Sequence, residues 1–219
     1  MLDLYLIRHA ESEMNLNNHL VSGRSNESPL SLRGIHQAVL LGRRLDQESV
    51  KFDRAYSSIA VRALDTARIV CPWIGYSIDE IVQSERLVEM SKGEWEGKPR
   101  MEIFTPEIMK SLETYPFGFK PPEGESQLDV EIRMYDWLYG HIMPNEHLDS
   151  LTIGVFSHGT AIKCLLRGLL DFNPKITYKM VLDNTSITRL KYSKGSWQVL
   201  TVNDAAHLLG ESKTEDLGY

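Results

Sequence analysis

The chain has 219 residues, of which 42% are hydrophobic and 25% charged, a balance typical of a folded globular protein. That length allows one substantial domain, and a net charge of −6 disfavours a non-specific nucleic-acid binder, since such proteins carry a basic excess. No apolar run is long enough to cross a bilayer or to act as a signal peptide, so we expect a cytoplasmic protein without a membrane partner.

The first part of the chain predicts three short strands separated by helices. Leu2–Ile7 is the first and is expected to be a short buried strand, and the other two are Arg54–Ser57 and Tyr76–Val82. Ser31 is a favourable N-cap for a helix that ends near Gln47. A second helix from about Ile59 ends at Cys71-Pro72, because proline cannot continue a helix. The residues expected on the apolar side of the first helix are Leu32, Ile35, Val39 and Leu45.

Residues 93–126 differ from the rest of the chain in being rich in proline, which interrupts regular structure. The prolines are Pro99, Pro106, Pro116, Pro121 and Pro122. We interpret this segment as an inserted helical lid within a single domain that spans residues 1–219. Trp95 and Met101 are expected to pack inside it.

The second half of the chain continues the alternation of strands and helices. Ser126 and Asp129 have the spacing of a capping box that begins a long helix. The residues expected to face inward on that helix are Leu128, Ile132, Tyr135 and Leu138. A strand, a helix and two closing strands follow, at Leu151–Phe156, Thr160–Leu170, Thr185–Tyr192 and Trp197–Val202. From Gly210 onward the chain is polar and is expected to fray.

Strands that alternate with helices predict an α/β fold, here a three-layer α/β/α sandwich with a mostly parallel sheet. Both cysteines, Cys71 and Cys164, fall in predicted helices. Two cysteines are too few for a disulfide scaffold, so we expect both to be reduced core residues.

Charged and polar residues stand at the ends of three predicted strands. Arg8 and His9 follow the first strand, Arg62 comes soon after the second, and His158 follows a later one. In a mostly parallel sheet the ligand site lies beyond the carboxyl ends of the strands, so these four side chains should share a small volume. Two positively charged guanidinium groups at such a short distance repel each other. A phosphate dianion relieves the repulsion and accepts charge-assisted hydrogen bonds, so we expect a phosphate site.

A phosphate ester bound there would meet a nucleophile. A neutral imidazole can attack phosphorus, and His9 is the candidate because it directly follows Arg8. His158 is expected to be a charged or donating group for the transferring oxygens, and the backbone N–H groups at Gly159-Thr160 are expected to add donors. The leaving oxygen needs a proton, which we assign to Glu89. The alternative carboxylates nearby are Glu85, Glu94 and Glu96.

The ordered blocks around these residues resemble those of the histidine phosphatase superfamily, also called the phosphoglycerate-mutase-like family. They cover nearly the whole chain, and they are Leu6-Ile7-Arg8-His9-Ala10-Glu11-Ser12, Ser28-Pro29-Leu30-Ser31, Ser57-Ser58 with Arg62-Ala63, Leu87 to Gly97, Gly124-Glu125-Ser126, Ser157-His158-Gly159 and Asn184-Thr185-Ser186-Ile187.

The resemblance implies that His9 is phosphorylated and that Glu89 is the proton donor. It implies that the phosphoryl group is held by Arg8, Arg62 and His158. Residues implied to bind the substrate nearby are Asn15, Ser22, Gly23 and Gly159. No metal ion and no other cofactor is implied.

The run Gly93-Glu94-Trp95-Glu96-Gly97 resembles the phosphatase branch of the family rather than the mutase branch. We therefore expect a cofactor-independent phosphomonoesterase that acts on a small phosphate ester through phosphohistidine. Two alternatives stay open, namely mutase-type phosphoryl transfer and a non-catalytic module that binds a phospho-ligand. The sequence identifies neither the ester nor the oligomeric state, for which a homodimer is one option. Arg24 and Lys92 are interpreted as solvated surface charges.

Overall fold

The computed structural model describes residues 1–143 and 150–210. Strands in this part of the chain form one sheet in the order β3-β2-β4-β1-β5-β6. Four of them run parallel, namely β1 (Leu2–Arg8), β2 (Arg54–Ser58), β3 (Val82–Ser84) and β4 (Leu151–Ser157). The antiparallel pair β5 (Ile187–Ser193) and β6 (Ser196–Asp204) extends the sheet beside β1. The predicted mostly parallel sheet is confirmed.

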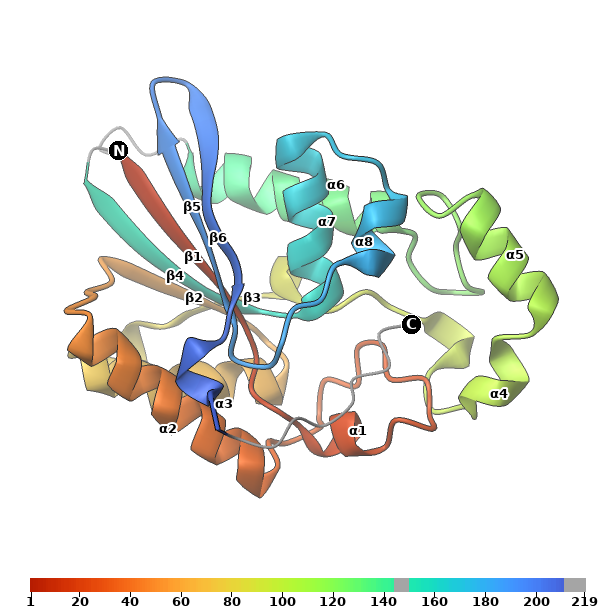
Figure 1. Cartoon of the computed structure of the whole chain (residues 1–219), viewed down its shortest axis with the longest axis horizontal. Helices are drawn as coiled ribbons and strands as arrows, with labels where there is room; N and C mark the ends of the chain where they lie inside the picture. The colour runs from red at the N-terminus through yellow and green to blue at the C-terminus, as the bar shows by residue number, and fades with distance from the viewer. Residues whose placement is uncertain (144–149, 211–219) are drawn as a thin grey trace.

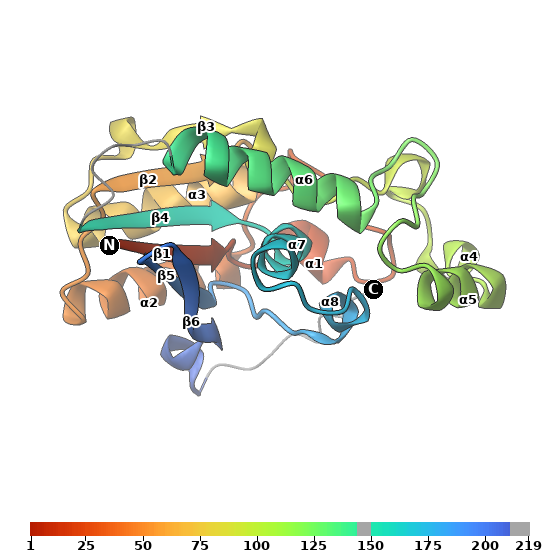
Figure 2. The ribbon, with the colours of Figure 1, turned by 90° about the horizontal axis from the view of Figure 1, so that it is seen from above.

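Helices cover both faces of this sheet (Figures 1 and 2). They are α2 (Leu32–Gln47) and α3 (Val61–Val70) on one face, and α6 (Gln127–Trp137) and α7 (Gly159–Leu170) on the other. Side chains of β1 reach both layers, because successive residues of a strand point to opposite faces. Leu4 and Leu6 belong to the core beneath α6 and α7, whereas Tyr5 and Ile7 belong to the core above α2 and α3. The predicted three-layer sandwich is therefore confirmed.

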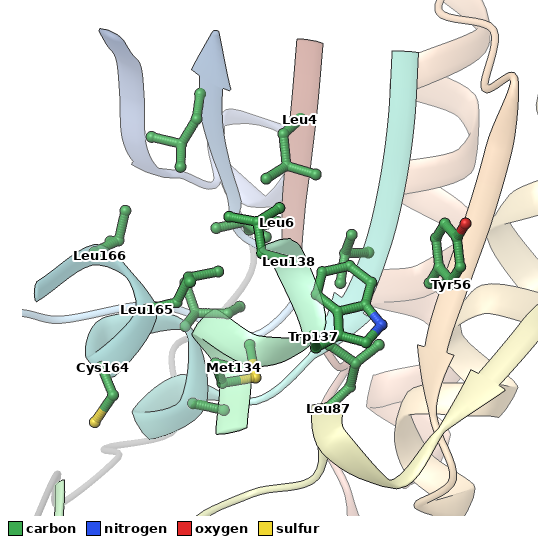
Figure 3. Packing of buried hydrophobic residues seen from close by; sticks show 14 of the residues in the cluster. Leu4, Leu6, Tyr56, Leu87, Met134, Trp137, Leu138, Cys164, Leu165 and Leu166 are labelled. Atoms are coloured by element: carbon green, nitrogen blue, oxygen red, sulfur yellow. The ribbon is translucent and has the colours of Figure 1, made fainter. Parts of the chain in front are cut away.

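The core beneath α6 and α7 is the larger of the two (Figure 3). Trp137 is 1% exposed, and its ring meets that of Tyr56 edge-on with centroids 5.4 Å apart. Cys164 lies in this core and Cys71 in the opposite one, and neither forms a disulfide. Burial raises the pKa of the Cys71 thiol to about 12. The expected reduced core cysteines are confirmed.

The buried side of helix α2 shares only Leu45 with the predicted apolar side, and it carries Gly34, Gln37, Ala38, Leu41, Gly42 and Leu45. Leu45 is buried, but Leu32 is 88% and Ile35 43% exposed. Gly34 lies so close to the Glu11 carbonyl oxygen that an added Cβ would sit 1.9 Å from it. The close approach of the helix backbone at Gly34 sets the buried face, so the prediction for Leu32 and Ile35 is wrong.

Helix α6 is also rotated relative to the prediction. Ser126 forms the expected capping box with Asp129. The predicted inward residues Leu128, Ile132 and Tyr135 are 38%, 51% and 37% exposed. The buried side instead carries Gln127, Val130, Glu131, Met134 and Trp137. Glu131 is buried at the contact with α7 because it pairs there with Arg167, an ion pair that an apolar periodicity does not reveal. Leu138 is buried as predicted, in a π-helical turn, Leu138–Ile142, that continues α6.

The third strand lies further along the chain than predicted. Short 3₁₀ helices occupy Cys71–Ile74 and Ile78–Glu80, and β3 pairs with β2 only over Val82–Ser84. The Ser77 hydroxyl caps the second of these turns by accepting from the Asp79 N–H. This local hydrogen bonding competes with a strand, so the predicted strand Tyr76–Val82 is wrong.

Residues 93–126 hold α4 (Arg100–Ile103) and α5 (Pro106–Thr114), which lie at the end of the molecule away from the β5–β6 hairpin (Figure 1). Trp95 packs there against the rings of Phe104 and Phe119, at centroid distances of 6.0 and 5.8 Å. Met101, predicted to pack, is 94% exposed. Two further short helices are α1 (Glu13–Leu16) and α8 (Lys175–Lys179).

No helix within residues 1–143 and 150–210 has the length and apolar character needed to span a membrane. The predicted frayed tail, residues 211–219, lies outside the described residues.

Candidate active site

A cavity of about 190 Å³ lies beyond the carboxyl ends of β1 and β4. In Figure 1, α1, α7 and α8 surround this end of the sheet. Eight of the nine predicted site residues line the cavity, namely Arg8, His9, Asn15, Ser22, Gly23, Arg62, Glu89 and Gly159. The ninth, His158, is fully buried directly behind Arg62. The structure therefore brings together residues that lie as far as 151 positions apart in the sequence, from Arg8 to Gly159.

His9 is 4% exposed and has a defined tautomer. Its Nδ1 lies 2.7 Å from the Ala10 carbonyl oxygen, which can only accept, so Nδ1 carries the hydrogen. Its Nε2 accepts a hydrogen bond from the Nε of Arg62 at 3.2 Å. Burial, followed by the charges of Arg62 and Arg8, holds the pKa of His9 well below its ordinary value. The imidazole is therefore neutral at pH 7, with its lone pair on Nε2.

The main chain on both sides of His9 is held by three neighbouring segments. The His9 N–H donates to the Ser157 carbonyl at 2.9 Å, and the His9 carbonyl accepts from Nδ2 of Asn184 at 3.0 Å. The Ala10 N–H donates to the Thr66 hydroxyl at 2.9 Å. These bonds, from β4, the loop before β5 and α3, fix where the imidazole points.

Arg62 is 4% exposed and stands in the first turn of α3. Besides His9, it donates to the Ser25 carbonyl at 2.8 Å and to the Nδ1 of His158 at 3.1 Å. Burial lowers the pKa of Arg62 to about 10, so the guanidinium stays charged at neutral pH. Arg8, which donates to the Leu182 carbonyl, supplies a second positive charge to the same cavity wall.

His158 is neutral in this structure. Burial, followed by the charge of Arg62, holds the pKa of His158 well below its ordinary value. Its Nδ1 accepts from Arg62, so Nε2 carries the hydrogen and donates to the Ser58 hydroxyl at 2.9 Å. Of the two predicted forms of His158, charged or donating, this structure has the neutral one, whose only donor is directed at Ser58.

Glu89 lines the cavity, while Glu85 and Glu94 are exposed. One of its carboxylate oxygens accepts from the Thr160 N–H at 3.0 Å, and the other accepts from the Ala161 and Met90 N–H groups at 3.1 and 2.8 Å. The first turn of α7 thus anchors this carboxylate. The prediction that the Thr160 N–H binds phosphate is wrong, because Glu89 occupies it.

The fourth carboxylate, Glu96, joins two loops instead of lining the cavity. It accepts from the backbone N–H groups of Arg24 and Lys92 at 3.1 and 2.9 Å. Gly23 lies against it with a φ of 67°, and an added Cβ would sit 2.4 Å from the Glu96 carboxylate. Glycine is needed at position 23 for both reasons.

A family model described as the histidine phosphatase superfamily (branch 1) matches residues 4–205. The chain belongs to this superfamily.

Relatives in this superfamily carry both mutase and phosphatase names. A probable phosphoglycerate mutase GpmB from Yersinia pestis is 31% identical over 216 residues, which cover 95% of each chain. A 2,3-bisphosphoglycerate-dependent phosphoglycerate mutase from Bartonella tribocorum is 31% identical over 78% of this chain and 82% of its own. Among solved structures, a mutant phosphoserine phosphatase from Entamoeba histolytica in complex with phosphoserine is 30% identical, with a TM-score of 0.80. That match covers 95% of this chain and 100% of the other.

Three of the cationic residues that line the cavity in this superfamily member were not predicted as site residues from its sequence, namely Lys92, Arg100 and Lys163. Lys92 was interpreted as a solvated surface charge, which is wrong. Lys163 follows Thr160 by three positions on α7, so helical periodicity from the predicted strand end could have found it. Arg24, by contrast, is 40% exposed and pairs with Glu125 at 3.2 Å, in accord with the prediction of a surface residue.

Proposed function

We propose that this chain is a cofactor-independent phosphomonoesterase that hydrolyses a small phosphate ester through a phosphohistidine on His9. The observation that carries the proposal is the neutral His9 in the wall of the cavity, whose Nε2 lone pair accepts a hydrogen bond from the guanidinium of Arg62. Glu89, a carboxylate able to carry a proton, lines the same cavity.

In the first step, the ester phosphate displaces the hydrogen bond from Arg62 to His9 and accepts hydrogen bonds from Arg62 and Arg8 instead. The His9 Nε2 attacks phosphorus, the bond from phosphorus to the ester oxygen breaks, and protonated Glu89 gives its proton to the leaving oxygen. The two guanidinium groups stabilise the transferring oxygens, and His158 positions Arg62 through its Nδ1.

In the second step, water replaces the departed alcohol. The Glu89 carboxylate takes a proton from this water, the water oxygen attacks phosphorus, and the bond from Nε2 to phosphorus breaks. Inorganic phosphate leaves, His9 is again neutral, and Glu89 is again protonated, so the cycle needs no further reactant.

Mutase-type transfer is the second candidate, favoured by the names of the sequence relatives. In a mutase the alcohol stays bound and takes the phosphoryl group back before water arrives. We favour hydrolysis because Gly93-Glu94-Trp95-Glu96-Gly97 resembles the phosphatase branch and because a phosphoserine phosphatase matches nearly the whole chain.

The test measures phosphate release from p-nitrophenyl phosphate and from a panel of alkyl phosphate esters. We expect release that is abolished by His9→Ala and is unaffected by a metal chelator. Transfer of phosphate between positions of 3-phosphoglycerate faster than phosphate release would establish the mutase instead. Binding of phosphate esters without turnover at any pH would establish a non-catalytic module.

A further inference from the structure

The loop before β5, which holds the main chain of His9, contains a strained residue. Thr185 is fully buried and has a φ of 57°, in the left-handed region, where a β-branched residue is rarely found. A residue persists in such a conformation only when its surroundings hold it there. The contacts of Thr185 therefore identify what holds this loop.

Two residues of the loop donate hydrogen bonds to the main chain of the nucleophile. The Thr185 N–H donates to the Arg8 and His9 carbonyls at 3.1 and 3.3 Å. The neighbouring Asn184 donates through its Nδ2 to the same His9 carbonyl at 3.0 Å. A change of φ at Thr185 would rotate Asn184 relative to β5, so the left-handed conformation and the bonds to His9 depend on each other.

A side chain from outside the loop contacts the strained residue. His207 belongs to the 3₁₀ turn Ala206–Leu208 that follows β6, and its Nε2 lies 2.8 Å from the Thr185 hydroxyl oxygen. That hydroxyl gives its own hydrogen to the Asn184 carbonyl at 2.7 Å, so the Nε2 of His207 carries a hydrogen and donates it. The Thr185 side chain is thereby held between His207 and the backbone of its own loop.

His207 is in turn held by β6 and α2. Asp204, at the end of β6, accepts from the Ala206 N–H at 3.1 Å and pairs with Arg44 of α2 at 2.6 Å. Burial lowers the pKa of His207 to about 4, so the imidazole is neutral at pH 7. Because His207 lies outside the lining of the cavity, any effect that it has on the reaction must pass through the loop.

We infer that His207 is a positioning residue for the nucleophile, on which it acts through Thr185 and Asn184. The inference rests on the proposed phosphoryl transfer to His9 and adds to it a residue that touches neither substrate nor reacting atoms. Without His207, Thr185 is free to relax to an ordinary φ, and the His9 carbonyl then loses donors. Misplacement of a reacting group by about 1 Å can cost about 10²-fold in rate, so a small shift of the His9 imidazole is enough to slow its attack on phosphorus.

The first experiment measures the rate constant for phosphorylation of His9 by rapid quench at saturating p-nitrophenyl phosphate. His207→Ala should reduce this constant by about tenfold or more. His207→Gln should keep most of it, because the glutamine NH₂ group can replace the Nε2 donor. Unchanged phosphorylation in His207→Ala would overturn the inference.

A second pair of variants tests whether the effect passes through the strained residue. Glycine adopts the left-handed conformation without being held there, so in a Thr185→Gly protein the further change His207→Ala should reduce the rate constant by less than about twofold. An equal reduction in the two backgrounds would overturn the inference.

A control separates positioning from a general loss of stability. Ile74→Val removes a methyl group from the smaller core, in the turn that follows the end of α3 remote from Arg62. It should destabilise the fold and leave the phosphorylation rate constant unchanged at a temperature where every variant is folded. An equal fall of the rate constant in Ile74→Val and His207→Ala would overturn the inference, because loss of stability alone would then slow the reaction.

The last experiment does not depend on turnover. The Nδ1–H signal of His9, identified by its absence from His9→Ala, is recorded by NMR in the protein without substrate. His207→Ala should shift or broaden this signal, and His207→Gln should leave it close to that of the wild type. An unchanged signal in His207→Ala would overturn the inference. The expected change of the signal, in a protein whose wild type does not become phosphorylated, would support the inference and refute only the proposed function.

Discussion

Glu89→Gln separates the role of this carboxylate in proton transfer from its role in holding α7. Glutamine has nearly the same shape but cannot give a proton to a leaving alkoxide. General acid catalysis contributes about 10²–10⁴-fold, so kcat/KM for glycerol 3-phosphate should fall by a factor in that range. kcat/KM for p-nitrophenyl phosphate should fall much less, because it reports the transfer to His9, and nitrophenolate is a weak base that leaves without a proton.

The same change has a structural cost that follows from the hydrogen bonds. The glutamine oxygen can keep the N–H groups of Met90 and Ala161, but its NH₂ group then faces the Thr160 N–H, which loses its acceptor. Such a loss costs about 1–3 kcal/mol. The melting temperature should fall by about 2–4 °C for each kcal/mol in a protein of this size.

The assay measures kcat/KM for both esters together with the melting temperature, at a temperature where the variant is folded. Glu94→Gln, at an exposed position five residues away, is the matched control and should change neither quantity. An equal loss on the two esters, or no loss on the alkyl ester, would refute the assignment of Glu89 as the proton donor.

Three further predictions concern the stability of the fold. Burial lowers the pKa of His207 to about 4, so between about pH 4 and 6.5 the unfolded state binds more protons than the folded state and the free energy of unfolding rises with pH. His207→Gln should reduce this rise, which is measured by urea denaturation at a series of pH values. Trp137→Ala should cost about 3–5 kcal/mol in the same assay, since it empties the centre of the larger core. Gly34→Ala should destabilise by about 1–3 kcal/mol through its clash with the Glu11 carbonyl, whereas Gly140→Ala, with nothing within 4 Å of the added Cβ, should be neutral or stabilising.

Residues at the strand ends were predictable because the rule that locates them is topological. Once β1, β2 and β4 are recognised as parallel, their carboxyl ends meet, and Arg8 must lie near Arg62 whatever the intervening chain does. The ordered blocks then singled out Glu89 among neighbouring carboxylates that local pattern alone could not separate. The structure shows why those neighbours differ from it, since Glu96 joins two loops and Glu94 is exposed.

Faces of helices and the lining of the cavity were less predictable, because they depend on pairs of distant residues. Helix α2 is oriented by the close approach of Gly34 to a loop, and α6 by the buried pair of Glu131 and Arg167. A hydrophobic periodicity weighs only large apolar side chains and misses both contacts. Lys92 was misread for the same reason, since a lysine in an irregular segment has no periodicity that shows which way it faces.

The most direct test of phosphoryl transfer through His9 is chemical trapping of the intermediate. The protein is mixed with a substrate ester, quenched in alkali within milliseconds, digested, and analysed by mass spectrometry for an acid-labile, alkali-stable phosphoryl group. We predict that this group is found on His9, that its amount rises before steady-state phosphate release, and that it is absent from His9→Ala. Rapid phosphate release without any labelled histidine, or a label on another residue, would contradict the mechanism.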